Sequence, residues 1–215
     1  MCDVRRATCS CADVPRAHVP RADVLLATCV IIAPVLALEG TRCTVRTWRK
    51  SDAVSLVQHA NNVNVARHLR DRFPHPYTER DAKAFLKHVT ATDDTSNLAI
   101  DVAGEAVGAV GFVPGRDIER FSAEIGYWLG EDFWGRGIVT EALSLVTSHV
   151  FSQLNFLRLY ALPFADNPAS VRVLEKAGYT REALLRASSV KYGIPKDQLL
   201  FSRINPDWNN PPRST

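Results

Sequence analysis

The fold of this chain is decided by the stretch Phe133-Trp-Gly-Arg-Gly-Ile-Val-Thr-Glu-Ala-Leu143. It follows a strand-like run over residues 123–129 and opens a run with helical spacing. The first N–H groups of a helix have no partner inside the helix, and this end carries a partial positive charge. Gly135 and Gly137 have no Cβ, so a ligand can approach them closely, and Arg136 can add charge-assisted hydrogen bonds. The stretch therefore predicts a seat for a phosphate group.

Two better-known phosphate motifs do not match this stretch. The dinucleotide pattern Gly-x-Gly-x-x-Gly fails because its last position is Thr140, and the P-loop pattern fails because no Gly-Lys-Ser/Thr follows. A Gly-x-Gly turn by itself is weak evidence, since a tight turn that binds nothing has the same sequence. The interpretation therefore depends on the rest of the chain.

Length and charge limit the class of protein. The chain has 215 residues, which suits one domain of ordinary size with a hydrophobic core. Its net charge of +3 comes from 26 basic and 23 acidic residues, and no dense Lys/Arg stripe is interleaved with aromatic residues. This balance argues against a nucleic-acid binder.

Residues 1–40 differ in character from the rest of the chain. They hold four of the five cysteines, and residues 24–38 form an apolar run shorter than the ~20 residues that span a bilayer. The odd number of cysteines argues against a disulfide framework, and Cys9-x-Cys11 lacks a second ligand pair, so we expect no metal. We interpret residues 1–40 as a dispensable extension or a mis-assigned start of a cytoplasmic protein. Export or membrane association, and a short apolar helix over residues 22–36, are the alternatives.

From residue 41 onward the sequence alternates between strand-like and helix-like segments. Strands are expected over residues 41–48, 98–102, 106–113, 121–129, 157–162, 182–190 and 198–204. Helices are expected over residues 51–60, 78–89, 137–152 and 167–176. Ser51-Asp52 can cap the first helix, polar residues 61–64 end it, and residues 206–215 are a tail. Strands interrupted by helices indicate an α+β or α/β domain with a mixed sheet.

Two motifs together resemble a known superfamily. They are Ile125-Gly-Tyr-Trp-Leu-Gly-Glu-Asp-Phe-Trp-Gly-Arg-Gly-Ile-Val-Thr-Glu-Ala-Leu143 and Asn167-Pro-Ala-Ser-Val-Arg-Val-Leu-Glu-Lys-Ala-Gly-Tyr179. In this order they resemble the GNAT superfamily of acetyl-CoA-dependent N-acetyltransferases over roughly residues 41–205. Val45-Arg-Thr-Trp-Arg-Lys-Ser-Asp-Ala53 resembles the first strand and turn of the branch that contains the ribosomal-protein alanine N-acetyltransferases. The resemblance implies the acyl-CoA N-acyltransferase fold, an α+β fold of the three-layer α/β type. Its mixed, mostly antiparallel central sheet has about seven strands, flanked by about four helices.

The resemblance also implies how the co-substrate acetyl-CoA is held. Superfamily members bind the pyrophosphate of coenzyme A through backbone N–H groups, which here belong to Gly135, Arg136, Gly137, Ile138, Val139 and Thr140. Trp134 and Val139 depart from the superfamily pattern Gln/Arg-x-x-Gly-x-Gly/Ala, but backbone donors tolerate such changes if the turn keeps its shape. The pantetheine arm is expected beside Trp128 and Leu129. Asn167 matches a side chain that contacts this arm, and its alternative role is to cap its helix.

Acetyl transfer from a thioester needs a neutral amine and benefits from a proton on the leaving thiolate. A lysine amine has a pKa of about 10.4 and an α-amine about 7.7–8, so a base is useful. The expected base is Glu124, which matches a glutamate of other superfamily members; a solvated or hairpin-paired carboxylate is the alternative. Many superfamily members have a tyrosine that acts as the general acid at the position of Leu174. Leucine cannot donate a proton, so Ser170 is the expected general acid. The alternatives for Ser170 are a helix-surface or cofactor-contacting role, and thiolate departure without a protein acid.

Other residues bear on the acceptor. Tyr127 and Trp128 face opposite sides of their strand, so one is expected in the acceptor groove and the other in the core. The loop Arg70-Asp-Arg-Phe-Pro-His-Pro-Tyr77 is expected to select the acceptor or to pack the first two helices. The histidines share no metal-ligand spacing.

Three functions are consistent with these residues. The first is N-acetylation of a protein or peptide α-amine by direct attack in a ternary complex. The second is the same reaction on a small amine such as an aminoglycoside, a polyamine or an amino acid. The third is a catalytically silent acyl-CoA-binding protein. We expect a monomer or homodimer with no nucleic-acid or membrane partner.

Overall fold

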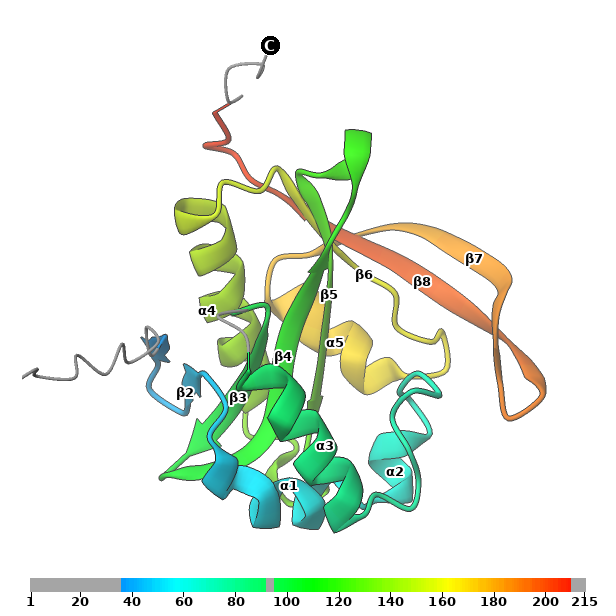
Figure 1. Ribbon diagram of the computed structural model, residues 1–215. Helices are drawn as coiled ribbons and strands as arrows, with labels where there is room; N and C mark the ends of the chain where they lie inside the picture. The colour runs from blue at the N-terminus through cyan, green and yellow to red at the C-terminus, as the bar shows by residue number, and fades with distance from the viewer. Residues whose placement is uncertain (1–35, 92–94, 210–215) are drawn as a thin grey trace, which may run out of the picture. The chain divides into compact units, whose positions relative to one another are not determined.

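The computed structural model describes residues 36–91 and 95–209, which are built around one sheet (Figure 1). Its eight strands lie in the order β1-β2-β3-β4-β5-β6-β8-β7. They are β1 (Ala37–Glu39), β2 (Thr44–Arg46), β3 (Asn97–Val102), β4 (Glu105–Pro114), β5 (Ser122–Leu129), β6 (Arg158–Ala161), β7 (Thr180–Lys191) and β8 (Ile194–Ile204). Neighbouring strands are antiparallel except β5 and β6, which are parallel. The expected mixed, mostly antiparallel sheet is confirmed. The additional strand is β1, which lies within residues 1–40, the segment expected to be an extension, and pairs with β2 in the sheet. Residues 1–35 of that segment, with nearly all of the alternative helix over 22–36, lie outside the described residues.

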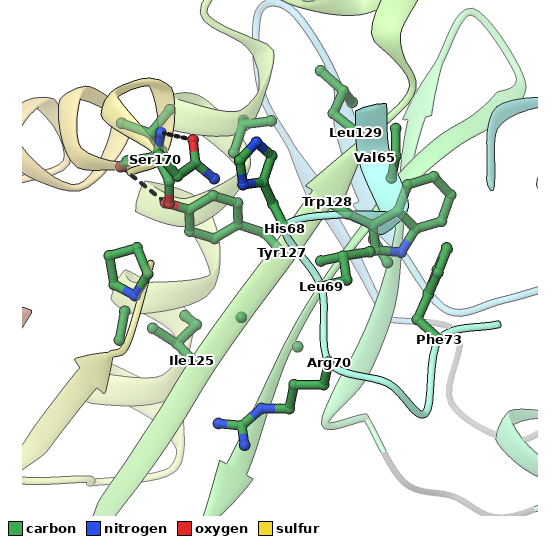
Figure 2. A pocket seen from close by; sticks show the side chains of 18 of the residues that line it. Val65, His68, Leu69, Arg70, Phe73, Ile125, Tyr127, Trp128, Leu129 and Ser170 are labelled. Carbon is green, nitrogen blue, oxygen red and sulfur yellow. Dashed lines mark hydrogen bonds between the residues drawn. The ribbon is translucent and has the colours of Figure 1, made fainter. Parts of the chain in front are cut away.

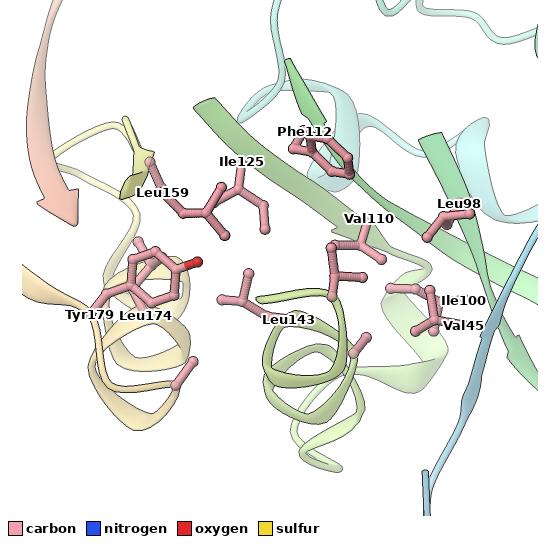
Figure 3. Packing of buried hydrophobic residues seen from close by; sticks show 14 of the residues in the cluster. Val45, Leu98, Ile100, Val110, Phe112, Ile125, Leu143, Leu159, Leu174 and Tyr179 are labelled. Atoms are coloured by element: carbon pink, nitrogen blue, oxygen red, sulfur yellow. The ribbon is translucent and has the colours of Figure 1, made fainter. Parts of the chain in front are cut away.

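Five α-helices accompany the sheet in the described residues. They are α1 (Ala53–Ala60), α2 (Val63–Ala66), α3 (Glu79–Val89), α4 (Ile138–Gln153) and α5 (Pro168–Lys176). α4 and α5 bury Leu143 and Leu174 against one face of the sheet, in a cluster we call the α4–α5 core (Figure 3). α1 and α3 bury Leu56 and Leu86 against the other face, in the α1–α3 core. A fully buried leucine contributes about 1.5–3 kcal/mol, so both cores stabilise the sheet. No helix in the described ranges has both the length and the apolar character needed to cross a bilayer.

α2 lies where the sequence predicted only an interruption. Asn62 has extended backbone geometry, and its side-chain oxygen accepts a hydrogen bond from the N–H of Asn64 at 2.8 Å. The polar residues therefore end α1 and also start a new turn. The amides of Asn62 and Asn64 donate to the carboxylate of Glu131 at 2.7 and 3.0 Å, which links α2 to the chain just before the glycine turn.

β5 separates the two cores, because successive side chains of a strand point to opposite faces. Ile125 and Leu129 are buried in the α4–α5 core, and Tyr127 packs against it. Trp128 packs against the α1–α3 core, and Glu124 has the same parity along the strand. The two faces of β5 therefore carry different chemical groups.

The pairing between β5 and β6 is short. Their register covers Ser122–Glu124 of β5 only, whereas β4 pairs with β5 as far as Leu129. Beyond Glu124 the two parallel strands separate and leave a gap within the sheet. A strand edge that loses its partner exposes backbone N–H and C=O groups, so the gap can bind an extended ligand.

The carboxylate of Glu141 in α4 holds the chain that enters β2. It accepts hydrogen bonds from the backbone N–H groups of Thr41, Arg42 and Cys43 at 3.1, 2.6 and 3.1 Å. Desolvation by burial opposes ionisation of this carboxyl group, but hydrogen bonds from Thr41 and from the backbone outweigh it and lower the pKa to about 2. These backbone groups are used by Glu141, which explains why β2 begins at Thr44 and not at residue 41 as expected.

A buried ion-pair network joins β2, β3 and the start of α1. Arg46 is 2% exposed, and its guanidinium donates to Asp101 at 2.7 Å and to Asp52 at 2.8 and 2.9 Å. Asp52 was expected to cap α1, but its side chain makes no cap hydrogen bond to that helix. The reason is that the carboxylate is taken up by Arg46 and by the N–H of Arg49. Removing one member of a buried pair leaves an uncompensated charge, which typically costs about 3–5 kcal/mol.

β7 and β8 form one long hairpin rather than the two shorter strands that the sequence predicted. Tyr192 and Gly193 make the turn, with φ values of +52° and +76°. β8 pairs with β6 only over Phe201–Ile204, so the outer part of the hairpin is a two-stranded ribbon. Near its tip, Lys191 donates to Asp71 between α2 and α3 at 2.8 Å, which holds the ribbon against that segment.

The Glu141 contact predicts a pH-dependent contribution to stability. Glu141→Gln should lower the free energy of unfolding near pH 7 by about 1–3 kcal/mol, because an amide oxygen accepts weaker hydrogen bonds than a carboxylate. The folded-state pKa is below the unfolded value, so the ionised form stabilises the fold above about pH 4.3 and this effect is lost as the pH falls toward about 2. Urea unfolding of both proteins should give a difference that is complete near pH 7 and shrinks below about pH 4.

Glu119→Gln is the matched control for this experiment, because Glu119 is exposed in a short turn. Glu119→Gln should change the free energy of unfolding by no more than about 0.5 kcal/mol, both near pH 7 and below about pH 4. A Glu141→Gln effect that is equal to the control near pH 7, or that does not change on acidification, would contradict the assigned role.

Candidate active site

A cleft of about 1780 Å³ opens where β5 and β6 separate (Figure 2). Its walls come from β4 and β5, from α3, from the starts of α4 and α5, from the segment between α2 and α3, and from the β7–β8 hairpin near its tip. Nearly all of the sequence-predicted site residues line it: Glu124, Trp128, Leu129, Gly135, Gly137, Ile138, Val139, Thr140, Asn167 and Ser170. Arg136 is the exception. The cleft therefore brings together residues that are separated along the chain.

The glycine turn has the geometry of an anion cradle. Gly135 and Gly137 both have φ of +75°, and the turn from Gly135 to Gly137 is exposed. Within the part of the chain that the structure describes, no backbone acceptor is found for the N–H groups of residues 135–140. They precede or begin α4, whose dipole favours an anion at this end. A Cβ on Gly135 would meet no atom within 4 Å, so the space in front of the turn is open to a ligand.

The turn is held in place by its neighbours. The indole N–H of Trp134 donates to the carbonyl oxygen of Leu129 at 2.8 Å, which ties the turn to the end of β5. Arg136 folds back, donates to the carbonyl of Asp132 at 2.6 Å and lies over the ring of Phe133 at 5.3 Å. Its guanidinium is thus used within the turn, and the main-chain N–H groups are the donors that face the cleft.

A pair of hydroxyl groups lies at the start of α5. The hydroxyl groups of Tyr127 and Ser170 are 2.8 Å apart, and the phenol also donates to the Ser170 carbonyl at 3.2 Å. Figure 2 shows Tyr127 directed from β5 toward Ser170. Burial raises the pKa of Tyr127 above its ordinary value, and the hydrogen bond from Ser170 only partly offsets this, so the phenol stays protonated. The sequence pointed to Ser170 but not to Tyr127 as its hydrogen-bond partner. The alternation of side chains along β5 limits Tyr127 to one of two faces, but it does not show which helix that face meets.

Asn167 caps α5. Its side-chain oxygen accepts a hydrogen bond from the N–H of Ser170 at 3.1 Å, which is the alternative role that the sequence left open. The cap keeps Ser170 at the mouth of the cleft. Leu174 is fully buried in the α4–α5 core. It occupies the position at which the resemblance places a tyrosine as general acid in many superfamily members. It has no proton to donate.

Glu124 lies on the opposite face of β5 and forms an ion pair with Arg70. The carboxylate side chain is 28% exposed, so it is accessible from the cleft. Arg70 belongs to the segment between α2 and α3, and it was not recognised as a partner of Glu124 from the sequence. Because the two residues are 54 positions apart, only the folded chain brings them together.

Aromatic packing fixes the segment between α2 and α3. Phe73 lies beside Trp128 (Figure 2), with their ring centroids 5.6 Å apart. The ring of Phe73 also lies 5.1 Å from that of Tyr77, which is buried. The backbone N–H of Tyr77 donates to the side chain of Asn61 at 3.0 Å. The two roles considered for this loop are therefore compatible, since it packs the helices and also lines the cleft.

The described part of the chain contains no group of three His, Cys, Asp or Glu side chains placed to hold a metal ion. His68 lines the cleft, and burial together with Arg67 lowers its pKa. An imidazole with a lowered pKa is largely neutral near pH 7.

Comparison with known proteins agrees with this geometry. The family model described as acetyltransferase (GNAT) domain matches residues 42–180. The uncharacterized N-acetyltransferase YoaA of Bacillus subtilis is 37% identical over 102 residues, or 47% of this chain and 57% of that protein. The ribosomal-protein-serine acetyltransferase of Escherichia coli is 32% identical over 101 residues, or 46% of this chain and 55% of that protein. The matches thus span little more than half the length of these two relatives.

A solved structure shares the fold. It is RimL, a ribosomal L7/L12 α-N-protein acetyltransferase in complex with coenzyme A. The two structures superpose with a TM-score of 0.68 over 79% of this chain and 98% of the other, at 22% identity. Because the family model covers more than half of the sequence, the chain belongs to the acetyltransferase (GNAT) domain family, and its domain is that of an acetyl-CoA-dependent N-acetyltransferase.

Proposed function

We propose that this protein acetylates the α-amine of a protein or peptide N-terminus by direct attack in a ternary complex. The observation that carries the proposal is the size and openness of the cleft, which extends from the glycine turn to the segment between α2 and α3. Its volume of about 1780 Å³ exceeds the roughly 300–1,000 Å³ of a typical small-ligand pocket. There is room for acetyl-CoA and for several residues of a peptide. The similarity to a ribosomal-protein-serine acetyltransferase supports a protein acceptor.

Small cationic amines fit this cleft less well. The lining contains seven Lys or Arg side chains but three carboxylates. A polyamine or an aminoglycoside carries several positive charges, which such a lining repels. An α-amine has a pKa of about 7.7–8, so roughly 10–17% of it is neutral at pH 7 and can attack, compared with less than ~0.1% of a lysine amine.

The donor end is built mainly from backbone groups. We assign the N–H groups of Gly135, Arg136, Gly137, Ile138, Val139 and Thr140 to the pyrophosphate of acetyl-CoA, because they are unpaired within the described chain and lie at the start of α4. The pantetheine arm is assigned to the open edge of β5 beside Trp128 and Leu129. The Nδ2 of Asn167 has no hydrogen bond to described residues, so it can donate to the arm while Oδ1 caps α5.

The two faces of β5 divide the proton transfers. Glu124 faces the segment between α2 and α3, from which an acceptor enters, and takes the proton that the amine loses as the C–N bond forms. Tyr127 and Ser170 lie on the other face. Ser170 donates a proton to the sulfur as the C–S bond breaks, and Tyr127 passes its own proton to Ser170 along their 2.8 Å hydrogen bond. Because the pKa of Tyr127 is raised, the phenolate takes a proton back from water before the next turnover.

The pyrophosphate assignment predicts a loss of coenzyme A affinity in Gly135→Ala. The added methyl group would occupy the open side of the turn, and alanine disfavours the φ of +75°. We expect an increase of about 10-fold or more in the Kd for coenzyme A measured by calorimetry, with a loss of about 1–2 kcal/mol in stability. Gly104→Ala is the matched control, since Gly104 has φ of +90° and equally open space but lies in the β3–β4 turn. Equal affinity in the two variants would contradict the assignment.

The catalytic assignment predicts separate effects on turnover and on binding. Glu124→Gln should lower kcat for an N-terminal peptide by about 10²–10⁴-fold, because the base is removed, and should leave the Kd for acetyl-CoA unchanged. Thiol release with acetyl-CoA measures kcat, and Glu119→Gln is the control. Wild type that binds acetyl-CoA but releases no thiol with any amine would identify a silent acyl-CoA-binding protein instead.

Ser170→Ala and Tyr127→Phe should each lower kcat by about 10–100-fold. If they form one proton relay, the double variant should be no slower than the slower single variant, because residues that act as a unit are not additive. If the decrease in kcat of the double variant equals the product of the two single decreases, the two hydroxyl groups have independent roles. Thermal unfolding of each variant separates these effects from loss of the fold.

A further inference from the structure

We propose that the acceptor carries acidic side chains within its first few residues, and that Arg67, Arg70 and Arg72 recognise them. This inference rests on the proposed function and adds the class of N-terminus. The three arginines lie between α2 and α3, and all of them line the cleft.

The segment that carries these arginines is held at both ends. At its start, Val65 and Ala66 of α2 are buried. Further along, Phe73 packs against Trp128 and Tyr77. The intervening residues are therefore presented to the cleft from a fixed base, whereas a free loop would lose conformational entropy when it bound a peptide.

The tip of the β7–β8 hairpin faces the same segment. Lys191 is 4% exposed and pairs with Asp71 at 2.8 Å, so it neutralises the one carboxylate among residues 67–72. Lys196 lines the cleft and pairs with Asp166 at 2.6 Å. In Figure 1 the hairpin and α2 lie on the opposite side of α5 from α4, which carries the glycine turn at its start. These cations therefore belong to the acceptor end of the cleft.

Arg67 and Arg72 form no ion pair with a carboxylate in the described residues, although the charge of Arg67 is one of the causes that lower the pKa of Glu131. Arg67 makes a hydrogen bond to the ring of His68 at 3.2 Å, and both Arg67 and Arg72 are exposed. The carboxylate of Asp81, which also lines the cleft, accepts hydrogen bonds from the N–H and hydroxyl of Thr78 at 2.9 and 2.5 Å. Guanidinium groups bind carboxylates through paired hydrogen bonds, so these exposed arginines favour an acidic peptide.

Arg70 differs from the other two because it already pairs with Glu124, the proposed base. An acidic side chain of the acceptor competes for the same guanidinium. When it replaces Glu124 as the partner of Arg70, the Glu124 carboxylate is released to accept the proton of the amine. Arg70 thus acts as a positioning residue that couples recognition of an acidic acceptor to activation of the base.

The test uses peptides that share an N-terminal alanine and carry three Glu, three Gln or three Lys residues at the next positions. Thiol release by the full chain should give the highest kcat/KM with the Glu peptide and the lowest with the Lys peptide, differing by about 10-fold or more. The ratio should fall as ionic strength rises, because salt screens exposed charges. A neutral N-terminal peptide that matches or exceeds the Glu peptide would overturn the inference.

Reversing the charge of one arginine tests whether the preference for the Glu peptide comes from these arginines. Arg72→Glu should reduce kcat/KM for the Glu peptide, raise it for the Lys peptide and leave the Kd for acetyl-CoA unchanged. Arg116→Glu is the matched control, because Arg116 is exposed outside the cleft and its replacement changes the net charge equally. Equal shifts in both variants would overturn the assignment to the arginines.

Arg70→Ala separates recognition from activation. If the ion pair restrains Glu124, this variant should raise kcat for the Gln peptide while it raises KM for the Glu peptide. A loss of kcat for both peptides, with normal thermal stability, would contradict the partner exchange. Acetylation of all three peptides at equal rates overturns the inference and leaves the proposed function standing, whereas acetyl-CoA binding without acetylation of any peptide overturns both.

Discussion

The arrangement of this domain depends on where one strand pair stops. β5 and β6 are paired only as far as Glu124, although β4 keeps β5 in the sheet to Leu129. The separation opens the sheet between its two cores and leaves an edge of β5 exposed. It also makes both faces of the same strand accessible, with Glu124 on one face and Tyr127 on the other. A continuous parallel pairing would close the gap and separate the donor from the acceptor.

Polar anchors hold the elements on either side of this gap. Glu141 fixes the start of α4 to the chain before β2, and the Arg46 network fixes β2 and β3 to the start of α1. The amides of α2 contact Glu131 directly before the glycine turn. The anchors lie outside the cleft or at its rim, so the backbone N–H groups inside it stay available for a ligand. The binding surface is therefore rigid without using its own donors.

Local sequence signals were sufficient for most of the fold and for part of the candidate site. The glycine turn, the strand before it and the helix cap at Asn167 each depend on neighbouring residues, and the structure has all three. Contacts between distant residues could not be read in this way. Tyr127 and Ser170 are 43 positions apart, and Arg70 and Glu124 are 54 apart. The β7–β8 hairpin is longer than the expected strands for a related reason, since the contact between Lys191 and the distant Asp71 holds its tip.

The glycine turn has a consequence for how such proteins diverge. The hydrogen-bond donors that we propose for the pyrophosphate are main-chain atoms, so the side chains at Trp134 and Val139 can serve the local packing, as the indole contact with Leu129 illustrates. Mutation can exchange these side chains without changing the donor substrate, provided that the two positive φ angles are kept. The acceptor recognition that we propose depends instead on side chains, those of Arg67 and Arg72 among them. Within one lineage, the acceptor can therefore change rapidly while the acyl donor stays the same.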